Sequence, residues 1–74
     1  KDGYMEDGKV RFQLPGEGNM DLTAYMQSLS RAGLDLPVFA EVSVQQSGKP
    51  DYDRWATAEF CFQALDRARR EAGV

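Results

Sequence analysis

The stretch Pro37-Val-Phe-Ala-Glu-Val-Ser-Val44 decides how this 74-residue chain is interpreted, because it places one carboxylate in an apolar, β-branched run. Such a run is typical of a buried strand, and side chains alternate between the two faces of a strand. One face would then be wholly apolar and the other mixed: Val38, Ala40, Val42 and Val44 on the first, Phe39, Glu41 and Ser43 on the second. Burying an unpaired carboxylate is unfavourable, so Glu41 either lies on a solvated face or meets a cation.

An amphipathic helix is predicted over residues 21–32, before this stretch. Leu22, Tyr25, Met26 and Leu29 follow the i, i+3, i+4, i+7 spacing of one buried face. Asp21 is a favourable N-cap, and Gly33 suits the left-handed position that follows many helices.

A second helix is predicted over residues 53–72, with Asp53 as its N-cap. Its apolar stripe comprises Trp55, Ala58, Cys61, Phe62, Leu65, Ala68 and Ala72. The basic cluster at 67–71 lies near the C-terminus of this helix, where cations complement the helix dipole. This interpretation is preferred over a nucleic-acid patch.

The N-terminal part is predicted to form a small hairpin or an extended excursion over residues 3–14, because Asp7-Gly8 favours a tight turn between short β segments. The turn-forming run at 15–19 then interrupts the chain. The order is therefore hairpin, helix, strand, helix. Helices on both sides of a strand favour an α/β fold whose parallel sheet is covered by helices.

Composition narrows the class of protein. The net charge of −3 argues against a nucleic-acid partner, and no apolar run reaches the roughly 18 residues of a membrane span. Histidine is absent, which removes Ser-His and Cys-His catalytic arrangements. Cys61 is the lone cysteine, so it predicts a reducing, cytoplasmic location, and its place on the apolar stripe indicates a core residue rather than a nucleophile.

Four motifs together resemble one family: KDG at 1–3, LPGEGNMDL at 14–22, AGLDLPVFAEVS at 32–43 and KPDYDRWATAEFCFQAL at 49–65. They are similar to the C-terminal end of the sugar phosphate isomerase/epimerase family, the xylose isomerase-like (β/α)8 TIM barrels. The resemblance covers nearly the whole chain and rests on the order and spacing of the motifs.

The resemblance implies that residues 1–74 are the C-terminal portion of one such barrel. Lys1-Asp2 would end the seventh strand, and 21–32 would be the seventh helix. Residues 37–44 would be the eighth strand, and 53–72 the eighth helix. A complete barrel needs about 250 residues.

The resemblance also assigns Glu41 two roles. Family members bind a divalent metal, commonly manganese, magnesium or cobalt, through two glutamates, an aspartate and a histidine. Glu41 matches the last glutamate, which implies a metal ligand and, in epimerase members, a catalytic residue that moves the substrate proton. The reaction would be isomerisation or epimerisation of a small sugar or sugar phosphate by proton transfer through an enediolate.

The other three ligands would come from the remainder of the barrel, because this chain starts just after the expected histidine position. Met5 stands where related epimerases often place a substrate-binding arginine. The 74 residues alone are therefore expected to be inactive, to bind no metal tightly, and either to be marginally folded or to self-associate through uncovered apolar surface.

Two alternatives stay open. One is another enzyme of the same barrel family, a sugar dehydratase or an apurinic endonuclease, although the acidic charge disfavours the endonuclease. The other is a stand-alone, non-catalytic α/β module that binds a partner through its exposed faces.

Overall fold

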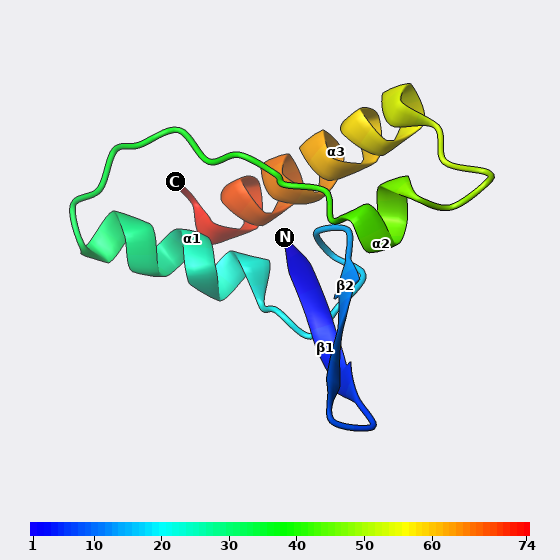
Figure 1. Ribbon diagram of the computed structural model, residues 1–74. Coiled ribbons are helices and arrows are strands. Elements are labelled where there is room, and N and C mark those ends of the chain that lie inside the picture. Colours follow the sequence, from blue (N-terminus) through cyan, green and yellow to red (C-terminus); the bar gives the residue numbers. More distant parts are fainter.

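Strands β1 (Asp2–Glu6) and β2 (Lys9–Gln13) form an antiparallel hairpin in the computed structural model, which describes all residues from 1 to 74. The turn is Asp7-Gly8, with φ of 51° and 75°. Two positive φ values match the twist of a hairpin, and Asp-Gly adopts them readily. The hairpin predicted over 3–14 is confirmed, and it projects away from the helices (Figure 1).

Helix α1 (Leu22–Arg31) begins and ends as its sequence predicts. The Asp21 carboxylate accepts a hydrogen bond from the Ala24 N–H at 2.9 Å. Gly33 follows the helix with φ of 71°, and the two hydrogen bonds of a Schellman motif close it. The helix predicted over 21–32 is confirmed.

Helix α3 (Arg54–Ala72) confirms the helix predicted over 53–72. The Asp53 carboxylate caps it by accepting two backbone N–H groups of the first turn, at 2.9 and 3.1 Å. Gly73 ends it in the left-handed conformation, with φ of 75°. None of the helices combines the length and the apolar character that crossing a bilayer needs.

The prediction of a strand over residues 37–44 is wrong for this structure. Residues 34–43 have no regular secondary structure, and a short helix, α2 (Val44–Ser47), begins where the strand was expected to end. A strand is stabilised by backbone hydrogen bonds to a neighbour, and β1 and β2 pair only with each other. The backbone of residues 35–42 makes no hydrogen bond within the chain. These residues therefore form no parallel sheet, and the fold is a small mixed α/β chain with one antiparallel pair and three helices.

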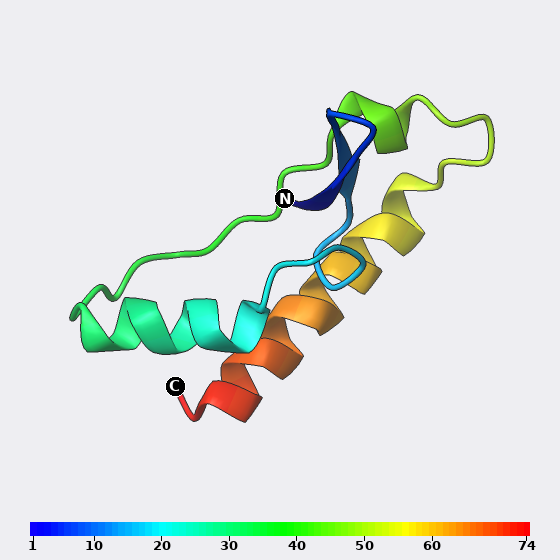
Figure 2. The ribbon, with the colours of Figure 1, turned by 90° about the horizontal axis from the view of Figure 1, so that it is seen from below.

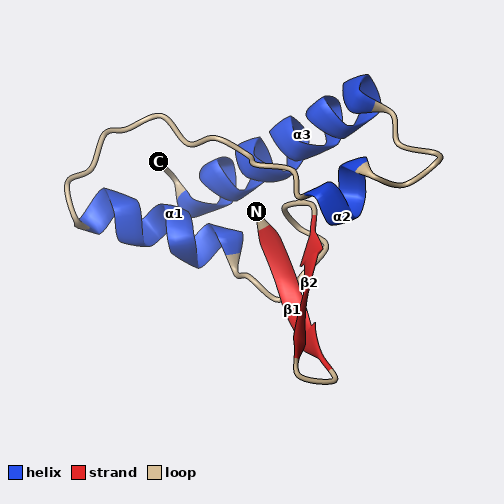
Figure 3. Cartoon of the chain, in the orientation of Figure 1, coloured by secondary structure: helices blue, strands red, loops and turns tan.

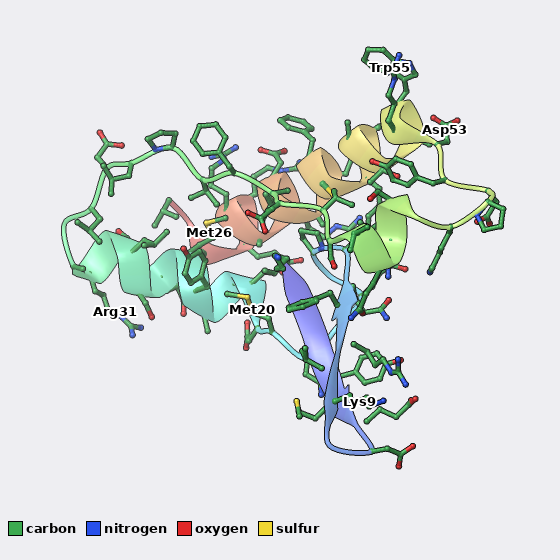
Figure 4. All side chains as sticks on the ribbon, viewed as in Figure 1. Lys9, Met20, Met26, Arg31, Asp53 and Trp55 are labelled. Atoms are coloured by element: carbon green, nitrogen blue, oxygen red, sulfur yellow. The ribbon has the colours of Figure 1, made fainter.

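The core between α1 and α3 is small. Met26 lies between the two helices (Figure 4), and only Cys61 and Ala68 join it as buried nonpolar side chains of the helices. Two large members of the predicted stripe on α3 are exposed, Trp55 to 74% and Phe62 to 68%. Trp55 projects away from the molecule at the first turn of α3 (Figure 4). Roughly half of that stripe thus remains uncovered.

The segment 34–43 connects the two ends of the molecule. It leaves the end of α1 and runs back past the N-terminus to α2, as the loop colouring of Figure 3 and the view from below in Figure 2 show. This path brings the residues around Glu41 to the start of β1. Residues that are 40 positions apart in the chain therefore become neighbours.

Candidate functional site

Glu41 meets a cation in the structure, and that cation is Lys1. The Lys1 Nζ atom lies 2.5 Å from Oε1 of Glu41. The side chain of Glu41 is 74% exposed, whereas that of Lys1 is 33% exposed. The carboxylate therefore lies at the surface in an ion pair, and its second oxygen is open to solvent.

The alternation of faces predicted for this segment persists only over residues 39–42, because Val38 is 37% exposed and Ser43 is half-buried. Phe39 is 82% exposed and lies on the same side of the pattern as Glu41, whereas Ala40 and Val42 are half-buried. Val38 lines a groove of about 620 Å³ between α1 and α3. The prediction fails at Val44, which is 78% exposed because it belongs to α2.

Phe12 on β2 completes the cluster around Lys1. The Lys1 ammonium lies 4.6 Å from the centroid of the Phe12 ring, within the range of a cation–π interaction. A shallow concavity of about 350 Å³ adjoins this cluster, and its lining includes Lys1, Phe12, Tyr4 and Met20.

Two glutamines of α2 hold the hairpin against the segment that carries Glu41. The Gln45 side chain accepts from the Phe12 N–H at 2.8 Å and donates to the Val10 carbonyl at 3.3 Å. The Gln46 side chain donates to the Phe12 carbonyl at 2.8 Å. Both backbone groups of Phe12 are thus satisfied by α2, which begins three residues after Glu41.

Asp2 fixes the other side of β1. Its carboxylate is 4% exposed and accepts four backbone N–H groups, those of Gly3, Gly16, Gly18 and Met20, at 2.7 to 3.1 Å. The loop that leads into α1 therefore wraps around one buried carboxylate. A Cβ atom at Gly18 would clash with that carboxylate, so the close approach requires glycine.

The carboxylates of Asp2 and Glu41 have different electrostatic environments. Burial raises the pKa of Asp2, but the four N–H donors outweigh it, and the net pKa lies below the usual value. At the surface, the hydrogen bond from Lys1 and then its charge lower the pKa of Glu41. Both groups are ionised at neutral pH.

A divalent metal fits this chain only in part. Glu41 offers a carboxylate of the right chemistry for manganese or magnesium, with one free oxygen. The Asp2 carboxylate is saturated by N–H donors, and no three His, Cys, Asp or Glu side chains gather closely enough to hold an ion. A metal site at Glu41 would therefore need further ligands from outside these residues.

Cys61 has no part in this cluster. It is buried on α3, and this burial, followed by the nearby charge of Glu17, raises the pKa of its thiol. A buried thiol with a raised pKa is a poor nucleophile, which confirms that Cys61 is a core residue.

The sequence pattern singled out Glu41 but not its neighbours. Lys1 and Asp2 were expected only at a strand end, and neither Phe12 nor the two glutamines of α2 carried any signal. The Lys1-Asp2 pair could have indicated that these two residues serve different contacts, because consecutive side chains of a strand point to opposite sides. Met5 is 66% exposed, and Arg11 pairs with Glu6 at 3.5 Å on the hairpin.

Comparison with known protein families, curated proteins and solved structures finds no match to this chain. The likeness to a family therefore rests on the four sequence motifs.

Proposed function

We propose that residues 1–74 are the C-terminal portion of a xylose isomerase-like TIM barrel and contribute Glu41 to the metal site of a sugar or sugar phosphate isomerase or epimerase. The observation that carries the proposal is the contact between Lys1 and Glu41. It brings together two of the motifs, KDG and VFAEVS, which such a barrel would hold at neighbouring strand ends.

The chemistry assigned to Glu41 follows from its exposure and its charge. A bound divalent ion, manganese, magnesium or cobalt, would polarise the carbonyl or adjacent hydroxyl of the substrate. Glu41 remains ionised at neutral pH, so it can bind the ion and accept the proton that leaves the carbon beside the carbonyl. The same group would return the proton to complete isomerisation through an enediolate.

These residues expose apolar surface that the remainder of a barrel would cover, which supports the barrel as their partner. Phe39, Trp55 and Phe62 are each more than two-thirds exposed, and residues 35–42 leave their backbone groups unpaired. Strands on either side of 37–43 would satisfy those groups and cover Phe39. The lone Cys61 supports a cytoplasmic location for the protein.

The test is Glu41→Gln in the longer protein that contains this chain. The change keeps the size and removes the charge, so metal content should fall, and turnover of a sugar panel should fall by at least about 10²-fold. Glu59→Gln, at an exposed position on α3, is the matched control and should behave as wild type. Near-normal turnover of Glu41→Gln with full metal occupancy would refute the proposal.

A second candidate is a stand-alone interaction module. The same exposed side chains favour it, because large uncovered apolar patches mark binding surfaces. A module folds and binds its partner as the 74-residue chain alone, whereas a barrel portion needs the preceding strands. Sedimentation and thermal unfolding of that chain separate the two candidates.

A further inference from the structure

Lys1 is held more firmly than surface lysines usually are. Its side chain is two-thirds buried, and its ammonium lies between the Glu41 carboxylate and the face of the Phe12 ring. Phe12 is itself held by two hydrogen bonds to glutamine side chains of α2, one at its N–H and one at its carbonyl. Two partners from different segments thus determine where the charge of Lys1 lies.

The backbone of β1 directs Lys1 to this place. The Asp2 side chain is buried in the loop that leads to α1, and neighbouring side chains point to opposite sides, so Lys1 is directed away from that loop. Gly3 is directly opposite Phe12 in the hairpin register. Because Gly3 has no side chain, the Phe12 ring is open to Lys1 two residues earlier.

We propose that Lys1 is a substrate-binding residue of the isomerase site, where its ammonium group contacts an anionic oxygen of the substrate beside Glu41; this inference rests on the proposed function. An ammonium carries three N–H donors, and only the carboxylate oxygen of Glu41 accepts from Lys1. Donors therefore remain for a ligand. When Glu41 binds a metal ion, the full charge of Lys1 becomes available beside it.

The surroundings fit a small sugar that bears or develops negative charge. The adjoining concavity of about 350 Å³ has an aromatic wall and lies in the size range of small-molecule sites. The anionic oxygen is either the enediolate oxygen that forms during the reaction or a fixed phosphate of the substrate. An ammonium binds both, and the kinetics of one variant separate them.

The experiment compares Lys1→Met with Lys9→Met in the metal-loaded longer protein. Lys1→Met keeps most of the aliphatic stem and removes the charge. Lys9, near the tip of the hairpin (Figure 4), makes no ion pair and is the matched control. We measure metal content, kcat, KM and the affinity for glycolohydroxamate, a mimic of the enediolate, for both variants. Lys1→Arg tests whether a different cation rescues the loss.

Lys1→Met should retain its metal but lose at least about 10²-fold in kcat/KM. If Lys1 contacts the enediolate oxygen, the affinity for glycolohydroxamate should also fall by at least about 10-fold. Lys1→Arg should recover part of the loss, and Lys9→Met should match wild type. A loss in kcat identifies the enediolate oxygen, and a loss confined to KM identifies the phosphate.

Wild-type kinetics and affinity in Lys1→Met, beside a Glu41→Gln variant that has lost metal and activity, overturn the role of Lys1 and leave the proposed function standing. A Glu41→Gln variant with normal metal and turnover overturns the proposed function, and the role of Lys1 falls with it.

Discussion

Asp2 is the most completely buried charged side chain of the molecule, and its four N–H donors show why that burial is tolerated. A buried carboxylate is stable when hydrogen bonds replace the lost water. Here the donors come from the adjacent Gly3 and from a loop 14 to 18 residues away, so one side chain joins β1 to the start of α1.

Asp2→Asn should destabilise the chain by about 1–3 kcal/mol, because the amide cannot accept from four donors and brings N–H groups toward them. Asp51→Asn, at an exposed position without hydrogen bonds, is the control. Urea unfolding followed by circular dichroism measures the difference. Equal midpoints for the two variants would show that the buried carboxylate contributes nothing.

Lowering the pH should remove the stabilisation of the folded chain that the Asp2 carboxylate provides. Its pKa in the folded chain lies below the ordinary value of 3.8, so its stabilisation is complete above that value and is lost as the pH falls through the lower, native pKa. The unfolding midpoint should therefore decrease below about pH 4. Asp66 and Glu41 also have lowered pKa values, and they contribute in the same direction. The part due to Asp2 is the difference in slope between wild type and Asp2→Asn, and parallel slopes would contradict its role.

The ion pair between Lys1 and Glu41 leads to a separate prediction about the pKa of Glu41. The hydrogen bond and charge of Lys1 lower the pKa of Glu41, so Lys1→Met should raise it toward the ordinary value of 4.5. Lys9→Met should leave it unchanged. Carboxyl chemical shifts followed by NMR against pH measure both, and an identical titration of Glu41 in the two variants would show that the pair does not form in solution.

Among the elements, α1 and α3 form as their own sequences dictate, whereas the segment between them does not. Each helix has an aspartate N-cap and a left-handed glycine after its end, and these local signals need no partner. The segment 37–43 has the composition of a strand, but a strand needs hydrogen bonds to another strand. Local patterns therefore predict the helices and the hairpin of this chain, but not the state of a segment whose strand pairing depends on a distant neighbour.

Asp53→Ala should reduce the helicity of α3. The aspartate accepts two N–H groups at the helix start, and loss of such a cap decreases stability by about 1 kcal/mol. Asp51→Ala, two residues earlier and outside the helix, is the control. Far-ultraviolet circular dichroism with urea measures the loss, which should be absent in the control.

At the scale of the whole molecule, the chain exposes more surface than a compact protein of its size. Its accessible surface is 5477 Å² for 8.3 kDa, where a compact monomer would expose about 4600 Å². The radius of gyration is 13.2 Å, compared with about 11 Å for a compact domain of this length. The excess surface, roughly 900 Å², is about what one partner buries in a standard interface.

The purified 74-residue chain should therefore self-associate or unfold without a sharp transition. Phe39→Ser, which removes the most exposed large apolar side chain, should reduce the association more than Met5→Ser on the hairpin. Sedimentation velocity and differential scanning calorimetry provide the measurements. A monomer with a cooperative transition near 50–60 °C would contradict the barrel proposal and favour the stand-alone module.

Local sequence determined the hairpin, both long helices and their caps, because turn and capping preferences act within a few residues. It also singled out Glu41 as a carboxylate that either lies on a solvated face or meets a cation. Only the tertiary structure decided that the cation is Lys1, that Phe12 lies beneath it and that Asp2 holds the loop before α1. These contacts join residues 11 to 40 positions apart, and no local pattern encodes which of many distant groups will meet. The state of residues 37–43 was decided in the same way, because pairing of a strand depends on a neighbour rather than on its own residues.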